Sequence, residues 1–448
     1  MSSRYKVEFP KEVNDTVWEV AYALNNPSLF IGLVGGCVRD TMLGLPINDY
    51  DIVVCNNPTS NEPKLTIEEV CAKLPGSFIV GKNCPIIIYK GFEISVKDSV
   101  EEDALNRDFT INAIYCKHNF SARYEVMGVH HWQHDIENKI LRINGDAEEI
   151  FTKDPLRILR GLRLVAKCRL EIEKETYYEI FRLRHLLINA DIHEDRIFNE
   201  LRKGFTCGRA YEFVKLLDEF ELLEHFFPAV HALKNVDGGH YHNETVFHHV
   251  LGALKSLDNT KLPFELKLAA LYHDVGKQKW EVTEDGKRRF SNHAAFGAEL
   301  VERDLSRLKF PRGVKVYVKT IVYNHMRQMD GKKSISHLVH DLKRGKIPLK
   351  HFVYLRYSDN KGNHKTKTDF KEHWRRYKFC LQILNPKHIP SVKDLKIGGR
   401  TLMRELKIEQ GKNVGIILNT LFKKVTAGEI ENKKKVLIEE AIKIYGAL

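Results

Sequence analysis

The hydrophobic and polar positions follow two different patterns along the chain. From Met1 to about Ile140, short apolar runs alternate with helical stretches; the runs are FIGLVGG, DYDIVV, SFIVG, IIIYKGFEISV, AIYCK and KILRI. Short apolar runs bounded by turn residues predict strands, so this part predicts a mixed sheet flanked by helices. From about Asp146 onward the pattern is helical and is broken at Gly and Pro. The chain is therefore predicted to be an α+β protein with an all-helical C-terminal part.

The length predicts more than one domain. A chain of 448 residues is too long for one compact core, so about two to four domains are expected. Turn-forming residues place candidate boundaries at Asn144-Gly145, at the Asn235–Gly239 turn and in the Asn385–Pro390 stretch. We therefore expect four segments, which are residues 1–145, 146–235, 236–385 and 386–448.

Composition narrows the class of protein. Lys and Arg number 71 against 59 acidic residues, a net charge of +12. This surplus suits a polyanion such as nucleic acid, although many proteins are mildly basic without such a partner. The eight cysteines are scattered with no C-x-x-C pair, which favours buried thiols in a reducing compartment. No N-terminal h-region or membrane-length apolar run is present, so we expect a cytoplasmic protein without a membrane partner.

The stretch Leu33 to Val54 carries the first candidate site. Gly35 and Gly36 precede a predicted helix over Cys37–Leu43, and paired glycines let a backbone approach an anion closely. Asp49 and Asp51 are two residues apart in the next apolar run, so in a strand they share a face. Carboxylates beside such a cradle suit Mg²⁺ and a nucleoside triphosphate. An isolated D-x-D is more often an acidic surface strand, but the glycine pair and the apolar neighbours favour the site.

This stretch resembles a known signature. GGCVRDTMLG followed by DYDIVV is similar to the motif of class II tRNA nucleotidyltransferases and bacterial poly(A) polymerases, which belong to the polymerase-β-type nucleotidyltransferases. The resemblance implies a polymerase-β-type head domain in which Asp49 and Asp51 hold two Mg²⁺ ions during in-line attack on the α-phosphorus. The matching positions are Gly35, Gly36, Val38, Arg39, Asp40, Leu43, Gly44, Asp49 and Asp51.

Two further motifs of the head support this resemblance. Glu93 shares a strand face with Ser95, and the family places a third catalytic acid there. Arg107-Asp108 resembles the family's second motif. Asp108 could accept a hydrogen bond from a ribose 2′-OH, Arg107 could neutralise phosphate or hold Asp108, and Asn112 could add a polar contact. Taken alone, an Arg-Asp pair is more often a surface ion pair.

The stretch KDPLRILRGLRLVAK resembles the family's E-D-x-x-R motif, which recognises the bases of CTP and ATP. Asp154 can accept from, and Arg157 can donate to, the Watson–Crick edge of a base. Lys153 replaces the preceding acid, so its orienting role is lost or supplied elsewhere. Arg160 and Arg163 suit a triphosphate or the RNA backbone. The alternative is a basic amphipathic helix without a ligand.

The helix HEDRIFNELRKGF resembles the neck helix of the same family. Arg196 and Glu200 are spaced i, i+4, which predicts an ion pair within the helix and a structural role.

A second site is predicted after Glu244. ETVFHHVLGAL, LYHDVGK, NHAAFG, VYNHM and LRYSDNKGN together resemble the HD phosphohydrolase domain. Imidazole with carboxylate favours a transition metal such as Mn²⁺, Ni²⁺ or Fe²⁺ over Mg²⁺ alone. The resemblance implies phosphatase or cyclic phosphodiesterase activity in RNA end repair, with Lys277 near a phosphate, whereas His248 is interpreted as a surface or core residue. The implied metal ligands are His249, His273, Asp274, His293, His325 and Asp359.

The last segment resembles the family's tail. Gly398, Gly411 and Gly415 are expected to open or break helices. Its basic residues offer phosphate contacts without sequence specificity, although a solvated basic face is an equal alternative. These residues are Arg400, Lys412, Lys423, Lys424 and Lys433 to Lys435.

Together these motifs predict a tRNA nucleotidyltransferase that adds C and A from CTP and ATP to the 3′ end of tRNA. Only Ile94 to Asn106 separates the Glu93 strand from the Arg-Asp motif, where the family has a longer flexible loop linked to the switch from C to A addition. CC-only addition is therefore the nearest alternative. A poly(A) polymerase is another, although GKNCPIIIY from Gly81 does not resemble that enzyme's specific stretch. An HD phosphohydrolase whose head only grips RNA is the third, and the oligomeric state is left open.

Overall fold

The computed structural model describes most of the chain, namely residues 5, 7–47, 49–60, 62–81, 85–119, 123–237, 245–283, 288–363, 369–384, 392–427 and 429–446. The chain forms two compact units. The first comprises Met1–His231, Asp258–Phe264 and Leu308–Phe310; the second comprises Ala232–Leu257, Glu265–Arg307 and Pro311–Leu448. Of the predicted boundaries, Asn144-Gly145 lies inside the first unit. The Asn385–Pro390 stretch and the end of the Asn235–Gly239 turn lie outside the described residues.

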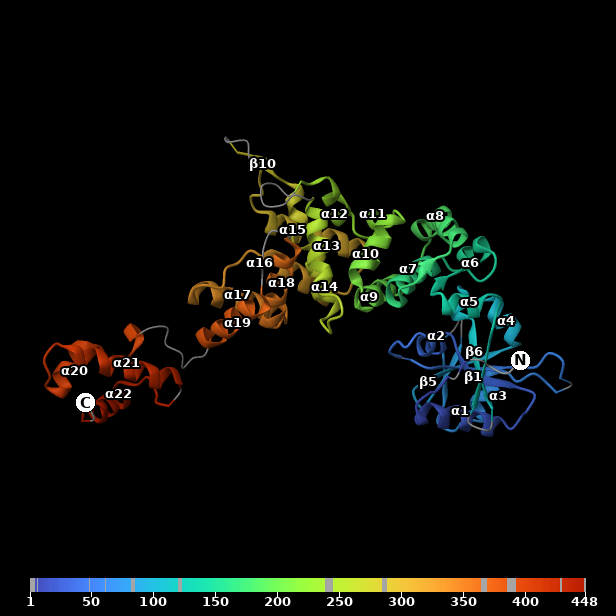
Figure 1. Ribbon diagram of the computed structural model, residues 1–448, viewed down its shortest axis with the longest axis horizontal. Coiled ribbons are helices and arrows are strands. Elements are labelled where there is room, and N and C mark those ends of the chain that lie inside the picture. Colours follow the sequence, from blue (N-terminus) through green and yellow to red (C-terminus); the bar gives the residue numbers. More distant parts are fainter. Residues whose placement is uncertain are drawn as a thin grey trace. The chain divides into compact units, whose positions relative to one another are not determined.

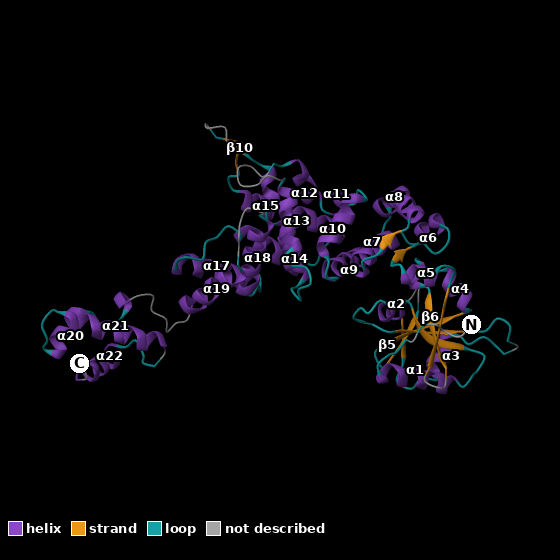
Figure 2. Ribbon diagram, in the orientation of Figure 1, coloured by secondary structure: helices purple, strands orange, loops and turns teal. Residues whose placement is uncertain are grey.

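A seven-stranded mixed sheet forms the core of the N-terminal part, as the alternating pattern predicts. Its order is β3-β4-β5-β2-β1-β6-β7, with β2 and β5 parallel and the other neighbours antiparallel. Figure 2 shows these strands gathered in one part of the chain, with helices nearly everywhere else. The strands are β1 (Phe30–Val34), β2 (Asp51–Cys55), β3 (Phe78–Val80), β4 (Ile86–Tyr89), β5 (Phe92–Lys97), β6 (Ile114–Asn119) and β7 (Arg123–Gly128).

The two strands at the centre of this sheet are buried. Every residue of β1 is buried, as are the last four residues of β2, because helices cover both strands. The run KILRI does not join the sheet. It forms β8 (Ile140–Leu141), which pairs in parallel with β9 (Glu171–Ile172) in a separate two-stranded sheet. The alternating pattern therefore indicated a strand there without identifying its partner.

Short helices connect the strands of the head. The helix after the glycine pair begins and ends one residue earlier than predicted. A capping box between Thr66 and Glu69 begins α3, and the Ser99 side chain caps α4. These elements are α1 (Lys11–Leu24), α2 (Gly36–Met42), α3 (Ile67–Ala72), α4 (Val100–Leu105), η1 (Thr110–Asn112) and α5 (Trp132–Glu137).

The rest of the first unit is helical. The helix α7 packs so closely on the head that a Cβ on Gly161 would lie 2.6 Å from the Phe109 ring. A Cβ on Gly204 of α9 would lie 2.2 Å from the Phe213 ring of α10. The helices are α6 (Ala147–Lys153), α7 (Leu156–Cys168), α8 (Lys174–Asn189), α9 (Glu194–Thr206), α10 (Ala210–Glu219), α11 (Leu223–Phe226) and α12 (Pro228–His231).

Among its described residues, the second unit is helical apart from one short antiparallel pair of strands, β10 (Glu281–Val282) and β11 (Arg288–Arg289). The helices α13 and α18 approach closely, since a Cβ on Gly252 would lie 3.1 Å from the Gly362 Cα atom. The elements up to residue 384 are η2 (Ala232–Asn235), α13 (Val246–Lys255), α14 (Phe264–Tyr272), η4 (Val275–Gln278), α15 (His293–Arg307), α16 (Arg312–Asn324), α17 (Lys332–Arg344), α18 (Leu349–Gly362) and α19 (Phe370–Leu384).

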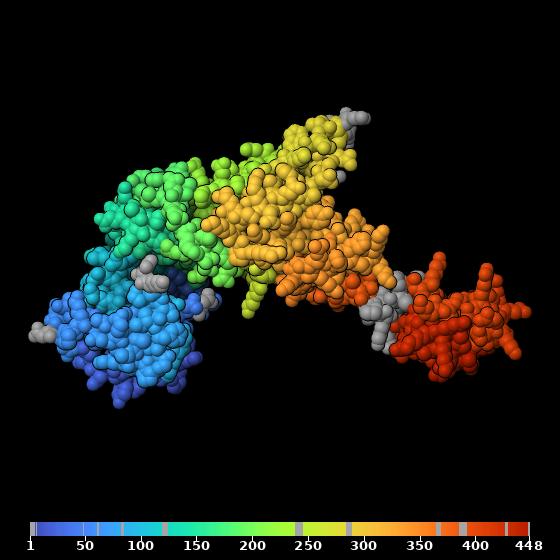
Figure 3. All heavy atoms as spheres, turned by 180° about the vertical axis from the view of Figure 1, so that it is seen from behind, coloured from blue at the N-terminus to red at the C-terminus, as the bar shows by residue number. Residues whose placement is uncertain are grey.

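The residues after 391, red in Figures 1 and 3, have a hydrophobic core of their own. This core includes Leu402, Ile417 and Leu437 from η5 (Val392–Asp394), α20 (Gly399–Leu406), α21 (Lys412–Ala427) and α22 (Lys434–Gly446) and their connections. Gly398 caps α20 and Gly411 directly precedes α21, as predicted, but Gly415 lies inside α21. That prediction was wrong because helix packing tolerates an isolated glycine.

Two predictions from composition concern the described residues as a whole. None of their helices is long and apolar enough to cross a membrane. The seven described cysteines are free thiols, and five of them are buried. Cys84 lies outside the described residues.

Candidate functional site

A cleft of about 440 Å³ in the first unit brings together most of the predicted nucleotide-site residues. They come from α2 and the glycine before it, from the start of β2 and the loop before it, from the segment after α4, and from α7. The predicted residues on its wall are Gly35, Gly36, Arg39, Asp49, Asp51, Arg107, Asp108, Asn112, Arg157, Arg160 and Arg163.

Asp49 and Asp51 lie on the wall of this cleft, whereas the third predicted acid, Glu93, is not part of its lining. Asp51 is the first residue of β2, and its register partner in the parallel strand β5 is Glu93. Asp49 lies in the loop before β2, so the predicted strand begins two residues later than DYDIVV suggested, yet both aspartates line the cleft. Burial, followed by the negative charge of Glu93, raises the pKa of Asp51. This concentration of negative charge fits a divalent cation such as Mg²⁺.

The glycine pair was predicted to let the backbone approach an anion, but Gly35 instead makes room for the Arg107 side chain. Gly35 has a φ of +74°, which favours glycine, and a Cβ there would lie 2.9 Å from an Arg107 Nη1 atom. Its N–H donates to the Ile114 carbonyl at 3.0 Å, so this amide does not point at an anion. The pair therefore allows a tight approach between β1, α2 and Arg107, and the Gly35 amide is not available to an anion.

Arg107 does not hold Asp108. Its guanidinium pairs with Asp103 at 2.8 Å and donates to the Tyr115 hydroxyl at 3.1 Å. The Tyr115 hydroxyl in turn donates to Asp103 at 2.7 Å. Burial raises the pKa of Asp103, but the charges of Arg107 and Lys97 and the hydrogen bonds from Tyr115 and Arg107 together outweigh burial, so the net shift of this pKa is downward. Sequence analysis did not identify Asp103 as a partner of Arg107, because Asp103 belongs to the acidic run EEDAL, which is typical of a solvent-exposed segment.

Asp108 is held instead by Arg160 and Asn112. Arg160 donates to it at 3.0 Å and the Asn112 amide at 2.8 Å. Burial opposes ionisation of Asp108, but the charges of Arg160 and Arg157 and the hydrogen bonds from Asn112 and Arg160 together outweigh burial and lower the pKa of Asp108. Asn112 also accepts from Arg39, which pairs with Asp40 at 2.7 Å. The Arg-Asp motif is thus a buried network whose partners lie far apart in the sequence.

Asp154 and Arg157 lie at the junction of α6 and α7. Asp154 caps the C-terminus of α6, and Arg157 lies in the first turn of α7, where it donates to the Asn106 carbonyl at 2.8 Å. Arg157 lines the cleft, whereas Asp154 is not part of its lining. Within the described part of the chain, the Asp154 Oδ1 and Arg157 Nε atoms are buried without a hydrogen-bond partner. One acceptor and one donor therefore remain for a ligand.

The neck helix α9 supports these residues by contacts with other helices. The predicted pair between Arg196 and Glu200 is not formed. Arg196 pairs with Asp154 at 2.8 Å, and Glu200 accepts from Arg163 at 2.6 Å. The i, i+4 spacing allowed an ion pair within the helix, but the packing of α7 on α9 offers each side chain a partner there.

Three charged residues on the cleft wall were not predicted as site residues. Asp40 accepts from Lys167 at 2.7 Å, and Lys203 of α9 also lines the cleft. The positions of Lys167 and Lys203 depend on the packing of α7 and α9 on the head, which local sequence does not reveal. Asp40 balances the charge of Lys167, so Lys203 supplies the net positive charge where a polyanion could lie.

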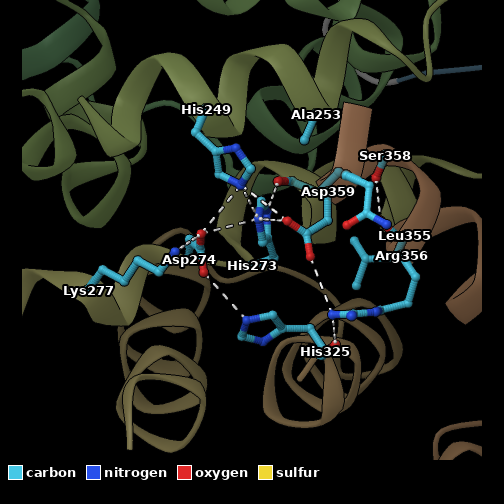
Figure 4. Close-up of polar contacts among 12 residues, drawn as sticks. His249, Ala253, His273, Asp274, Lys277, His325, Leu355, Arg356, Ser358 and Asp359 are labelled. Carbon is cyan, nitrogen blue, oxygen red and sulfur yellow. Dashed lines mark hydrogen bonds and ion pairs between the residues drawn. The ribbon is translucent and has the colours of Figure 1, made fainter. Parts of the chain in front are cut away.

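In the second unit, all six predicted metal-binding residues form one cluster. Figure 4 shows His249 of α13 and Asp359 of α18 facing His273 and Asp274, with His325 on the opposite side of Asp274. The His249 and His273 Nε2 atoms are 3.0 Å apart, and Asp359 Oδ1 lies 3.2 Å from His249 Nε2. Two groups of three ligand atoms could each hold a metal ion, and both include Asp274; they are His249, His273 and Asp274, and Asp274, His293 and His325.

Charge in this cluster favours a cation. Burial lowers the pKa of His273, but Asp274 and then Asp359 outweigh it and raise that pKa to about 10. Lys277 contacts Asp274 Oδ2 at 2.6 Å, and Arg356, which was not predicted, lies 3.4 Å from Asp359 Oδ2. His248 is exposed and contacts Thr245, as its interpretation as a surface residue requires.

Ion pairs occupy part of the basic surface of the tail. Lys424 pairs with Glu440 at 2.6 Å, and Lys433 pairs with Glu431 at 2.7 Å. The prediction that these two lysines face phosphate therefore competes with partners inside the tail.

Three family models match parts of the chain. They are the poly A polymerase head domain over residues 88–142, the probable RNA and SrmB-binding site of polymerase A over 169–234, and the tRNA nucleotidyltransferase domain 2 over 294–441.

Similar proteins cover more of the chain. A CC-adding tRNA nucleotidyltransferase of Thermus thermophilus is 27% identical, over 90% of this chain and 91% of the relative. A multifunctional CCA protein of Neisseria meningitidis is 31% identical, over 62% of this chain and 68% of the relative. The solved CCA-adding enzyme of Bacillus stearothermophilus with CTP has a similar fold, with a TM-score of 0.60 and 19% identity, over 98% of this chain and 99% of that one.

Proposed function

This chain belongs to the family of tRNA nucleotidyltransferases and bacterial poly(A) polymerases, and we propose that it adds nucleotides from CTP to the 3′ end of tRNA. One observation carries the proposal. Asp49, Asp51 and the arginines of α7 line the same cleft, and Glu93 of β5 is the register partner of Asp51, although these residues come from separate motifs. An acidic metal site beside fixed guanidinium groups is what phosphoryl transfer from a nucleoside triphosphate requires.

The acids would hold the metal ions of this reaction. Asp49 and Asp51, with Glu93 beside them, would hold two Mg²⁺ ions, which supply charge stabilisation to an in-line displacement at the α-phosphorus. Arg107 and Lys203 on the cleft wall would neutralise the triphosphate.

The remaining residues would orient the nucleotide. Asp108, ionised and fixed by Arg160, would accept the ribose 2′-OH hydrogen bond. The buried Asp154 Oδ1 atom would accept from the exocyclic amino group of cytosine or adenine, and the Arg157 guanidinium would donate to the adjacent ring nitrogen. Uracil presents a carbonyl in place of the amino group, so this pair would reject UTP.

The product identifies the reaction. A tRNA lacking its 3′ CCA end is incubated with CTP, with ATP, or with both, and the product is weighed by mass spectrometry. We expect two cytidines from CTP alone. No incorporation would overturn the assignment, and long adenosine tails on unstructured RNA would indicate a poly(A) polymerase.

The connection between β5 and α4 favours CC-only addition. Only Asp98 and Ser99 separate Phe92–Lys97 from Val100–Leu105, so no long flexible loop exists there. The Thermus thermophilus relative, which matches nearly the whole chain, is a CC-adding enzyme. We therefore expect no adenosine after CC, and a CCA product in the same mass analysis would contradict this.

The histidine–aspartate cluster favours a second activity, metal-dependent hydrolysis of phosphoesters. Six clustered imidazole and carboxylate groups suit Mn²⁺, Ni²⁺ or Fe²⁺, and Lys277 and Arg356 place positive charge beside them. The test follows two reactions of RNA ends with each metal added: opening of a 2′,3′-cyclic phosphate to a phosphomonoester, and release of phosphate from a terminal phosphomonoester. Activity should be lost in His273→Ala but kept in His248→Ala. No hydrolysis with any of these metals would remove this second function.

A further inference from the structure

The Asp108 carboxylate is held by polar contacts from two sides. Its Oδ1 atom accepts from the Asn112 amide at 2.8 Å, and its Oδ2 atom accepts from Arg160 at 3.0 Å. The contacts continue beyond Asn112, through α2, to Lys167 in the last turn of α7. We propose that Lys167 is a positioning residue for sugar selection, which acts through these contacts to hold Asp108 where it would accept from the ribose 2′-OH. This role rests on the proposed ribose recognition by Asp108.

The Asp40 carboxylate joins Lys167 to Arg39. Its Oδ2 atom accepts from Lys167 Nζ at 2.7 Å. Its Oδ1 atom accepts twice from Arg39, from Nη2 at 2.7 Å and from Nε at 2.9 Å. Asp40 and Arg39 are both buried, and charge-assisted hydrogen bonds of these lengths are among the strong ones in proteins. The two basic side chains therefore fix this carboxylate between α2 and α7.

The Asn112 amide connects Arg39 with Asp108. Its Oδ1 atom accepts from Arg39 Nη1, and its Nδ2 atom donates to Asp108 Oδ1. Since a guanidinium only donates and an ionised carboxylate only accepts, both neighbours require the same orientation of the amide. The opposite orientation would place the amide oxygen against the carboxylate and the NH₂ group against the guanidinium. Arg39 therefore keeps the Asn112 donor directed at Asp108.

Lys167 keeps Arg39 available for Asn112. Without the charge of Lys167, the Asp40 Oδ2 atom would lose its hydrogen bond from Nζ while it stays buried, and an unpaired buried carboxylate oxygen is costly. Arg39 could recover this loss by donating to both oxygens of Asp40, because a guanidinium matches a carboxylate with two parallel hydrogen bonds. That movement would withdraw Nη1 from Asn112 and leave the amide free to turn. Asp108 would then lose a fixed donor.

Direct binding of the triphosphate is the alternative role for Lys167. Both Lys167 and Lys203 line the cleft. The geometry favours positioning, because Lys167 Nζ is engaged by Asp40 and the Lys167 side chain is only 20% exposed. A lysine that binds phosphate acts equally on CTP and dCTP, whereas a lysine that acts through Asp108 affects only the nucleotide with a 2′-OH. The two roles therefore predict different kinetics.

Kinetics of the full chain with CTP and dCTP test the proposal. The primer is a tRNA that lacks its CCA end, and kcat/KM is measured for each nucleotide. In Lys167→Met, kcat/KM for CTP should fall about two- to tenfold while that for dCTP changes little, because dCTP lacks the hydroxyl group. Lys167→Arg, which keeps the charge, should restore most of the CTP to dCTP ratio. Lys203→Met, the matched control on the same cleft wall, should lower both values alike and leave the ratio unchanged.

A double variant shows whether Lys167 acts through Asp108. In the Asp108→Asn background, Lys167→Met should lower the CTP to dCTP ratio no further, because residues that act as one unit have non-additive effects. A second fall as large as that in the wild-type background would overturn the proposed connection between the two residues.

The contrary outcomes separate the role of Lys167 from ribose recognition itself. If Asp108→Asn lowers the CTP to dCTP ratio, an unchanged ratio in Lys167→Met, or equal losses with both nucleotides, would overturn the positioning role alone. An unchanged ratio in Asp108→Asn would instead overturn ribose recognition by Asp108, on which the role of Lys167 rests. Circular dichroism shows which variants are folded, and Lys167→Gln, which keeps a polar group, takes the place of Lys167→Met if that variant does not fold.

Discussion

Arg196 of the neck helix donates to the Asp154 carboxylate at 2.8 Å. The two residues are forty-two positions apart in the sequence. This contact occupies Oδ2 of Asp154, while Oδ1 remains buried without a partner in the described part of the chain. Lys153 stands where the family motif has an acid, and Arg196 is the residue that orients Asp154 in this chain.

Arg196→Ala should therefore weaken base recognition. A hydrogen bond to a charged group contributes about 1.5–3 kcal/mol, so kcat/KM for CTP should fall roughly tenfold to a hundredfold and discrimination against UTP should decrease. Steady-state kinetics with both nucleotides measures this. Arg182→Ala, which removes an exposed ion pair with Glu179, is the control and should leave both values unchanged. If Arg196→Ala and Asp154→Ala have fully additive effects, the two residues do not act as a unit.

Asp51→Asn should abolish CTP incorporation without unfolding the chain. Glu93 and Asp49 place negative charge beside Asp51, and a metal ion would neutralise this charge. Metal ions contribute several kcal/mol to the stabilisation of the transition state of phosphoryl transfer. We expect a loss of at least about a thousandfold. Asp49→Ala should behave alike, whereas Asp98→Asn, at an exposed aspartate after β5, should not. Near-normal incorporation by Asp49→Ala or Asp51→Asn would end the two-metal assignment.

Asp108→Asn should reduce selection of ribose over deoxyribose. The amide keeps the size of the side chain but loses the charge that Arg160 and the 2′-OH both need. The ratio of kcat/KM for CTP to that for dCTP should fall, by roughly tenfold if one charged hydrogen bond is lost. An unchanged ratio would show that another residue reads the sugar.

Acid should destabilise the head through Asp103. The pKa of Asp103 is lower in the folded protein than in the unfolded chain, where it is about 3.9. Ionised Asp103 therefore stabilises the fold fully at pH values above about 3.9, and this stabilisation is lost as the pH falls through the lower pKa of the folded state. The urea midpoint of the wild type should therefore fall as the pH is lowered below about 4. Asp103→Asn should start lower and fall less over that range. Parallel pH profiles for the two proteins would contradict the assignment to Asp103.

Gly161→Ala should destabilise the first unit because the added methyl group meets the Phe109 ring. Overpacking of this kind costs about 1–3 kcal/mol and should lower the melting temperature. Since α7 carries Arg157 and Arg160, and Phe109 follows Asp108, CTP incorporation should fall as well. Gly313→Ala, where no atom lies within 4 Å of the new methyl group, is the control and should be neutral or stabilising. Equal melting temperatures for both variants would show that Phe109 moves aside freely.

Much of the fold and most of the candidate site follow from local sequence. Short apolar runs bounded by turn residues predict β1, β2 and β5, because such runs are typical of strands in a buried sheet. The spacing of Asp49 and Asp51, the Arg107-Asp108 pair and the six histidine and aspartate residues of the second unit are local patterns too. Their chemistry is recognisable before any contact is known, since side-chain type decides which ligand a group can bind.

Only the tertiary structure decided which charged groups are partners. Sequence analysis paired Arg107 with Asp108 and Arg196 with Glu200, as their spacing allowed, but the structure pairs Arg107 with Asp103 and Arg196 with Asp154. An ion pair forms where two charged side chains meet away from water, and burial depends on how separate helices and strands pack. For the same reason, the sequence by itself determined that Asp274 belongs with histidines, whereas the fold decided that its two oxygens face two different pairs.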